Sequence, residues 1–411
     1  MASSRLAYPS SPTVNAALNW SLAALRVAPS PTTRVLHNPT AAALVAAAPP
    51  DAVTRPAAAS TVRVFAAPSA ATPAPTAAAQ PSAVQWVRLL SAVAGRLERS
   101  STLYVVDGDV GGAAAVRLLT ASAGVAAAAR LALGRLPGRA PTPSAVVMVA
   151  GGGLPGDAAS AARRYGVDAE GGGAYVAVYD EAGIVGVAGP EVGMEGGGVP
   201  SAAAVREGIA AVVAPSFTSG VLLRSALTSD TLLVGAAAGS SAAAASASGM
   251  GHHLLSATAL TRAWACAAAA DDAAATVGDV LTAPTTRLTR DGDARRSVGV
   301  PATLTLVLGD GAGAAKGGKT PAAKAVPSQA AAAFYFLAAG ASPAAAAADR
   351  VAAAWAFGRA AAAAGADVLV APGGKAAKAE LADRVAAEVE GTGVSVKGDE
   401  LVDDVPDAPA A

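Results

Sequence analysis

The chain has 411 residues, with 30 basic and 30 acidic side chains and a formal net charge of +0, so no bulk positive charge is available for nonspecific nucleic-acid binding. Hydrophobic residues make up 53% of the chain but aromatic residues only 4%, and most of the apolar count is alanine, which buries little area. The single cysteine, Cys266, excludes an internal disulfide framework, and with only three histidines a structural zinc cluster is not expected. No stretch has the pattern of a membrane span, and the length is sufficient for two domains.

The first 50 residues are basic and rich in serine, alanine and proline. They contain Arg5, Arg26 and Arg34, and the first acidic residue is Asp51. This composition is typical of an organelle transit peptide, and it fits a mitochondrion and a chloroplast equally. The alternative is a disordered alanine- and proline-rich tail, which would leave the protein in the cytoplasm. The Pro/Ala composition of 66–81 is typical of a flexible linker.

From residue 84 onward the pattern predicts mixed helices and strands. Val84, Val87, Leu90 and Val93 have a helical spacing. Apolar runs bounded by turn residues predict strands, and alanine-rich segments predict helices, one of which has serine at its start and glycine at its end. The strands are expected at 103–108, 116–120, 144–153, 174–180, 183–189, 303–313 and 366–374, and the helices at 328–340, 343–365 and 380–390. The class is therefore α/β, in the sense of mixed α+β.

Residues 230–248 have the outline of a phosphate-binding loop without its chemistry. An apolar strand at 232–234 runs into glycine, serine and alanine. Such a loop needs backbone N–H groups around the phosphates, a lysine, and a hydroxyl for the metal. The lysine position falls on Ser241, the hydroxyl position on Ala242, and the next lysine is Lys316. The candidate phosphate contacts are Gly235, Gly239, Ser240 and Ser241.

Seven segments in chain order, among them RVLHNPTAAALVAAA, LYVVDGDVGG with VRLLT, GIVGVAGPEVGMEGG, DTLLVGAAAGSS and ADVLVAPGG, carry a family resemblance. Together they resemble ATP-dependent phosphoenolpyruvate carboxykinase over roughly residues 34–374. The resemblance implies an N-terminal α/β domain and a C-terminal, P-loop-like mononucleotide domain. The expected organisation is 1–81 as transit peptide and disordered segment, 82–229 and 230–390 as the two domains, and 391–411 as an acidic tail.

The departures from that family fall where its chemistry would be. Its metal site needs a lysine, a histidine and an aspartate. The two lysines that the family has after the positions of Met194 and Glu195 correspond to Gly196 and Gly197, and its two aspartates after the loop correspond to Ala257 and Thr258. The segment that carries its histidine has none, and the segment that carries its substrate-binding arginine, around 66–73, has no arginine. Its late arginine motif is represented ambiguously, by Arg295 and Arg296. Its early arginine corresponds to Arg117, which is either a retained anion contact or part of a structural ion pair.

These observations leave three hypotheses. The first is a pseudoenzyme in an organelle, with a structural or interaction role, other proteins as partners and no cofactor. The second is an active carboxykinase with relocated residues, converting oxaloacetate and ATP to phosphoenolpyruvate, CO2 and ADP as in gluconeogenesis, with ATP and Mg²⁺ or Mn²⁺. The third is an alanine-biased chain that folds poorly.

Other polar residues have modest expectations. His252 and His253 are interpreted as a loop pair without a ligand role, the alternative being a metal site. Asp310 is interpreted as a structural residue at a strand end, although a metal position is also possible there. Cys266 is expected to be a buried small hydrophobe. Lys316, Lys319 and Lys324 are expected to form a solvated basic loop or, alternatively, to contact ATP.

Overall fold

The computed structural model describes a defined part of the chain, and all structural statements refer to it. The described residues are 32–40, 43–44, 53–54, 63–66, 83–110, 114–133, 145–150, 164–165, 175–179, 184–188, 202–218, 220–227, 231–235, 251–262, 275–276, 297–308, 323–344, 347–372 and 378–389. The chain divides into two compact units. Unit 1 comprises Met1–Val213 and Ala267–Ala294, and unit 2 comprises Ala214–Cys266 and Arg295–Ala411. The sequence predicted that the second domain starts at residue 230, whereas unit 2 starts at Ala214.

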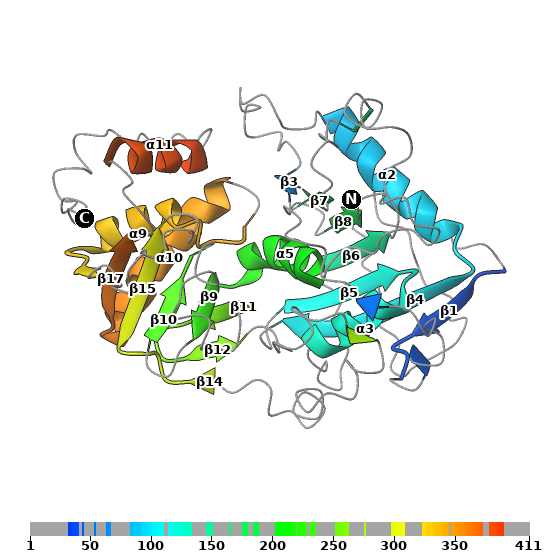
Figure 1. Ribbon diagram of the computed structural model, residues 1–411, viewed down its shortest axis with the longest axis horizontal. Helices are drawn as coiled ribbons and strands as arrows, with labels where there is room; N and C mark the ends of the chain where they lie inside the picture. Colours follow the sequence, from blue (N-terminus) through cyan, green and yellow to red (C-terminus); the bar gives the residue numbers. More distant parts are fainter. Residues whose placement is uncertain are drawn as a thin grey trace. The chain divides into compact units, whose positions relative to one another are not determined.

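Unit 1 is built on a seven-stranded mixed sheet (Figure 1). Its strands are, in spatial order, β1 (Arg34–His37), β4 (Thr102–Val110), β5 (Ala114–Thr120), β6 (Ala145–Ala150), β8 (Ile184–Ala188), β7 (Tyr175–Tyr179) and β3 (Arg63–Ala66). Strands β5 and β6 are buried along their whole length, as expected for strands in the middle of a sheet. Strand β6 is a continuous apolar run, whereas β5 includes Arg117 and Thr120. Strands β1 and β3 belong to this sheet, although the sequence-based prediction placed their residues ahead of the first domain.

Three helices pack on this sheet: α2 (Ala83–Glu98), α3 (Ala123–Ala132) and α5 (Ala202–Val213). Helix α2 was predicted, but its buried face differs from the predicted one. Val84 and Val87 are exposed, and the buried stripe is Leu89, Leu90, Val93 and Leu97. Helix α3 begins at Ser122, whose hydroxyl accepts a hydrogen bond from the Val125 N–H at 3.3 Å. A two-stranded sheet of β2 (Val53–Thr54) and β13 (Ala275–Thr276) also belongs to unit 1.

Unit 2 is built on an eight-stranded mixed sheet. Its strands are, in spatial order, β14 (Ser297–Val298), β12 (Leu260–Arg262), β11 (Gly251–Leu255), β9 (Val221–Leu227), β10 (Thr231–Val234), β15 (Thr303–Leu308), β17 (Asp367–Pro372) and β16 (Lys324–Ala325). Strands β10, β15 and β17 run parallel, and the remaining pairs are antiparallel. The mixed α/β class predicted from the sequence is therefore confirmed.

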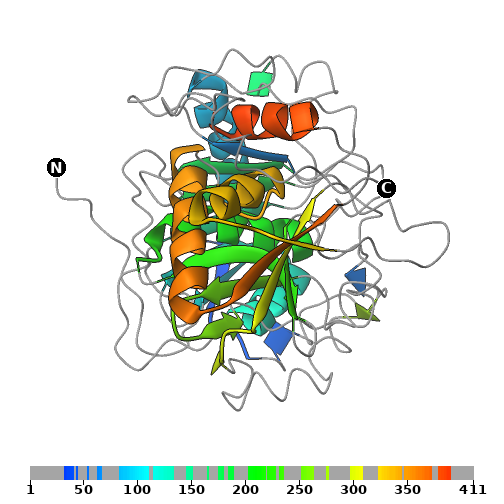
Figure 2. The ribbon, with the colours of Figure 1, turned by 90° about the vertical axis from the view of Figure 1, so that its left-hand side faces the viewer.

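Helices α9 (Gln329–Ala338), α10 (Ala347–Ala364) and α11 (Lys378–Val389) complete unit 2, with the short 3-10 helix η2 (Ala214–Ser216) at its start. Helices α9 and α10 pack against each other and against the sheet (Figure 2, gold and orange). The predicted limits of α9 are confirmed, because Ser328 caps its first turn by accepting from the Ala331 N–H at 3.1 Å and Gly340 follows it with φ 58°. The core lies between this helix layer and the sheet, where the rings of Phe336 and Phe357 are 4.9 Å apart. Among the described residues, no helix is long and apolar enough to cross a membrane.

Candidate functional site

Gly235, the first glycine of the phosphate-loop pattern, ends strand β10 and is enclosed by backbone. Its N–H donates to the Arg224 carbonyl at 2.9 Å, so this amide is used within the sheet. Its φ is +134°, and a Cβ atom there would lie 2.9 Å from the Ala339 carbonyl oxygen and 2.9 Å from that of Val307. Close backbone approach explains the glycine without a ligand. The other candidate phosphate contacts, Gly239, Ser240 and Ser241, lie outside the described residues.

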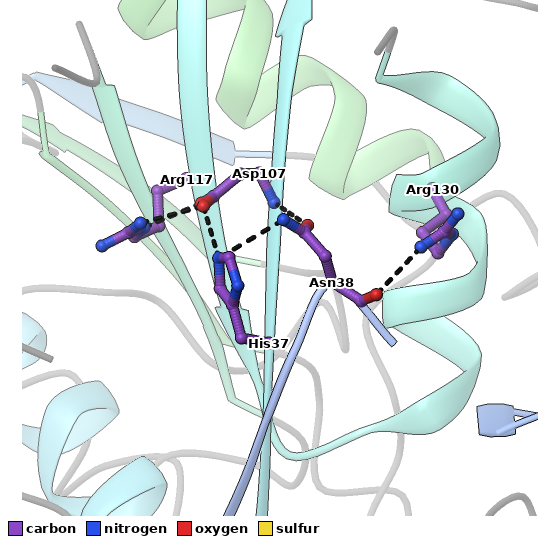
Figure 3. Close-up of polar contacts among 5 residues, drawn as sticks. All are labelled: His37, Asn38, Asp107, Arg117 and Arg130. Carbon is purple, nitrogen blue, oxygen red and sulfur yellow. Dashed lines mark hydrogen bonds and ion pairs between the residues drawn. The ribbon is translucent and has the colours of Figure 1, made fainter. Parts of the chain in front are cut away.

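Arg117 takes part in a buried ion pair between neighbouring strands. It lies on β5 directly opposite Asp107 on β4. Arg117 Nε donates to Asp107 Oδ1 at 2.7 Å and Nη2 donates to Oδ2 at 2.9 Å, in the two-pronged geometry that suits a guanidinium and a carboxylate (Figure 3). Both side chains are 1% exposed. Arg117 is therefore part of a structural ion pair, the second of the two interpretations. Two of the Arg117 N–H donors are used by Asp107.

His37 joins the ion pair from strand β1. Its Nε2 lies 2.6 Å from Asp107 Oδ2, and its side chain is 0% exposed. Asp107 therefore contacts the Arg117 guanidinium through both carboxylate oxygens and the His37 imidazole through Oδ2. The other ring nitrogen, Nδ1, is buried without a hydrogen-bond partner among the described residues.

Asn38 connects Asp107 and His37 to the end of strand β1. The Asp107 N–H donates to Asn38 Oδ1 at 2.8 Å, which fixes the amide orientation and turns Nδ2 toward His37 Nε2, 3.3 Å away. The backbone of Asn38 has φ 45°, a left-handed conformation that asparagine tolerates better than most residues. Arg130 on α3 stabilises this turn by donating from Nη1 to the Asn38 and Pro39 carbonyls at 3.2 and 2.6 Å (Figure 3).

The His37–Asp107–Arg117 cluster holds β1, β4 and β5 together, and its burial keeps it from contact with a substrate. The sequence analysis did not single out His37 or Asp107. A signal for Asp107 existed, because a hairpin centred on Gly112 places it opposite Arg117. His37 had no such signal, because β1 and β4 are paired in parallel and lie far apart in the sequence.

The interpretation of His252 and His253 as a loop pair is wrong. Both lie on strand β11 and are buried. The strand is held between β9 and β12, and Ser225 Oγ lies 2.9 Å from His253 Nδ1. A buried hydrogen bond therefore replaces part of the hydration that the imidazole loses in the sheet.

The remaining candidates are only partly described. Lys324 lies on the short strand β16, paired with Val370 on β17. Asp310, Cys266, Arg295, Arg296, Lys316 and Lys319 lie outside the described residues. Within the described ranges, no three His, Cys, Asp or Glu residues are grouped so that they could hold a metal ion.

No protein-family model matches the chain, and a search of the curated proteins finds no match.

Proposed function

We propose that this chain is a non-catalytic protein with a structural or interaction role, built on a scaffold that resembles ATP-dependent phosphoenolpyruvate carboxykinase. It would act in the mitochondrion or the chloroplast, with other proteins as its partners. Its role would need no nucleotide or metal. One observation carries the proposal. The two described candidates for anion binding, Gly235 and Arg117, direct donors to the protein itself, to the Arg224 carbonyl and to the Asp107 carboxylate.

This observation bears on catalysis because phosphoryl transfer depends on electrostatic stabilisation. Phosphoryl transfer depends almost entirely on positioning and on the neutralisation of charge. A single preorganised donor in such a site contributes about 2.7–4 kcal/mol to catalysis. The sequence has serine at the loop lysine position, Ser241, and glycine at the two positions where the family has lysines, Gly196 and Gly197. Losses of this size at several positions are sufficient to abolish turnover, even though they do not add linearly.

Nucleotide binding tests the proposal. Mg-ATP and Mn-ATP are titrated into the full chain in a calorimeter, and near-ultraviolet circular dichroism with a thermal melt verifies the fold of the same sample. We expect a cooperative melt and no saturable heat up to millimolar nucleotide. A noncooperative melt would instead favour the poorly folding chain.

If nucleotide binding is observed, a matched loop variant shows whether the phosphate-loop segment is responsible for it. In Gly239→Asp a carboxylate stands where the resemblance places the phosphates. Saturable micromolar heat from the native chain that disappears in Gly239→Asp would contradict the proposal, because the loop would then bind nucleotide without its lysine. The alternative function, an active ATP-dependent carboxykinase, would then have to be assayed with oxaloacetate.

A further inference from the structure

Unit 2 contains a groove of about 470 Å³ along one side of helix α10, here called the α10 groove. Its volume lies within the range of small-molecule sites. One wall is formed by α10 and the other by the chain from η2 into β9. The lining includes Asp349, Ala352, Ala356 and Arg359 from α10, with Phe217 and Val221 opposite.

The α10 groove has a charge of opposite sign toward each end. Asp349 lies in the first turn of α10, and Arg359 lies ten positions further along the helix. At 1.5 Å per residue the two positions are separated by about 15 Å along the helix axis. Asp349 is half-buried, and burial raises the pKa of its carboxyl, an effect that the neighbouring Arg350 only partly opposes. A positively charged ligand group next to Asp349 would provide the compensation that burial removes.

Between the two charges the α10 wall consists of alanine methyl groups, those of Ala352, Ala353 and Ala356. Methyl groups neither donate nor accept hydrogen bonds, so a peptide backbone laid along them would leave its N–H and C=O groups on that side unpaired, which costs free energy. An aliphatic stem has no such requirement and gains from burial. A fatty acid has no positive group for Asp349, which would then face methylene groups. A diamine would place an ammonium next to the positively charged Arg359. Neither ligand matches both charges.

We propose that the α10 groove binds a linear aliphatic molecule with an ammonium group at one end, held by Asp349, and a carboxylate at the other, held by Arg359. The backbone positions of Asp349 and Arg359 are about 15 Å apart along the helix axis, and an extended chain of roughly twelve carbon atoms has a comparable length. This inference goes beyond the proposed function and is independent of it, because none of the lining residues belongs to the phosphate-loop pattern or to the His37–Asp107–Arg117 cluster.

The test uses 12-aminododecanoate on the full chain, below its micellar concentration, with calorimetry as the readout. Trp355, which is 45% exposed on α10, provides a second signal through its fluorescence, and Trp355→Phe assigns that signal. We expect saturable binding that weakens about tenfold in Asp349→Asn and about tenfold in Arg359→Gln, since each change removes one charge-assisted contact. Dodecanoate and dodecylamine, each with one charged end, should bind more weakly by a similar factor, and 6-aminohexanoate is too short to reach both ends.

Two matched variants serve as controls. Asp383→Asn on α11 and Arg88→Gln on α2 change exposed residues that do not line the groove, and both should bind the probe like the native chain. The asparagine amide keeps the shape of the aspartate without a buried charge, so Asp349→Asn should melt no lower than the native protein. The proposal would be overturned by the absence of binding. Equal binding of all three long-chain probes, or equal loss in control and groove variants, would also overturn it.

Discussion

Replacing Asp107 with asparagine is expected to lower the free energy of unfolding of unit 1 by about 3–5 kcal/mol. The change leaves the Arg117 guanidinium, which is 1% exposed, buried without its carboxylate. It also replaces one of the two carboxylate oxygens, which contact Arg117 and His37, by an amide nitrogen. Denaturant titration measures the loss of unfolding free energy. Hydrogen exchange in peptides that cover β4 and β5 tests whether the loss arises in these two strands.

Two further variants separate the ion pair from a general effect of mutation. Asp367→Asn changes an exposed carboxylate at the start of β17 and should cost less than about 0.5 kcal/mol. The double variant Asp107→Leu with Arg117→Met should recover a large part of the lost stability, because no unpaired charge remains buried. If Asp107→Asn behaves like Asp367→Asn, the cluster does not hold the three strands together as inferred.

Gly235→Ala is expected to destabilise unit 2 by about 2–5 kcal/mol, through strain at positive φ combined with overpacking. The new Cβ would lie 2.9 Å from two backbone carbonyl oxygens, those of Ala339 and Val307, and backbone cannot move aside as a flexible side chain can. Thermal or denaturant unfolding of the purified variant measures the loss. The result matters for function, because it assigns this glycine to packing between β10, β15 and the end of α9.

Two other glycines provide the comparison. Gly365 also has positive φ, +66°, but open space where its Cβ would stand, so Gly365→Ala should cost only the conformational part, about 1 kcal/mol. Gly299 has open space as well, and its φ is not in the positive region, so Gly299→Ala should be nearly neutral. Equal stability of the Gly235 and Gly365 variants would show that the carbonyl contacts at Gly235 are not restrictive.

The elements predicted best from the sequence are those whose signals are local. Serine before an alanine run and glycine after it define α9, since Ser328 and Gly340 satisfy backbone groups at its two ends. The apolar runs at 174–180 and 183–189, which were predicted as strands, are β7 and β8, and they pair antiparallel. The apolar runs of β15 and β17 are likewise strands of the unit 2 sheet.

The errors arise where tertiary contacts decide. A stripe built from successive steps of three residues rotates backward by about 60° at each step of a helix with 3.6 residues per turn. Val84 and Val93 therefore lie on opposite sides of α2, and only Val93 is buried. His252 and His253 were assigned to a loop, but strand pairing on both sides and the Ser225 hydroxyl accommodate them in a sheet. In the candidate site, the contribution of His37 follows from a strand pairing that local sequence does not encode.

A turnover assay tests directly whether the chain is non-catalytic. The full chain is incubated with oxaloacetate, ATP and Mn²⁺, and phosphorus NMR follows the appearance of phosphoenolpyruvate against a protein-free sample. We expect no phosphoenolpyruvate above that background from a folded sample, because the charges that phosphoryl transfer requires are missing from the matching positions. Phosphoenolpyruvate that forms in proportion to the protein concentration would contradict this expectation and establish the chain as an active carboxykinase.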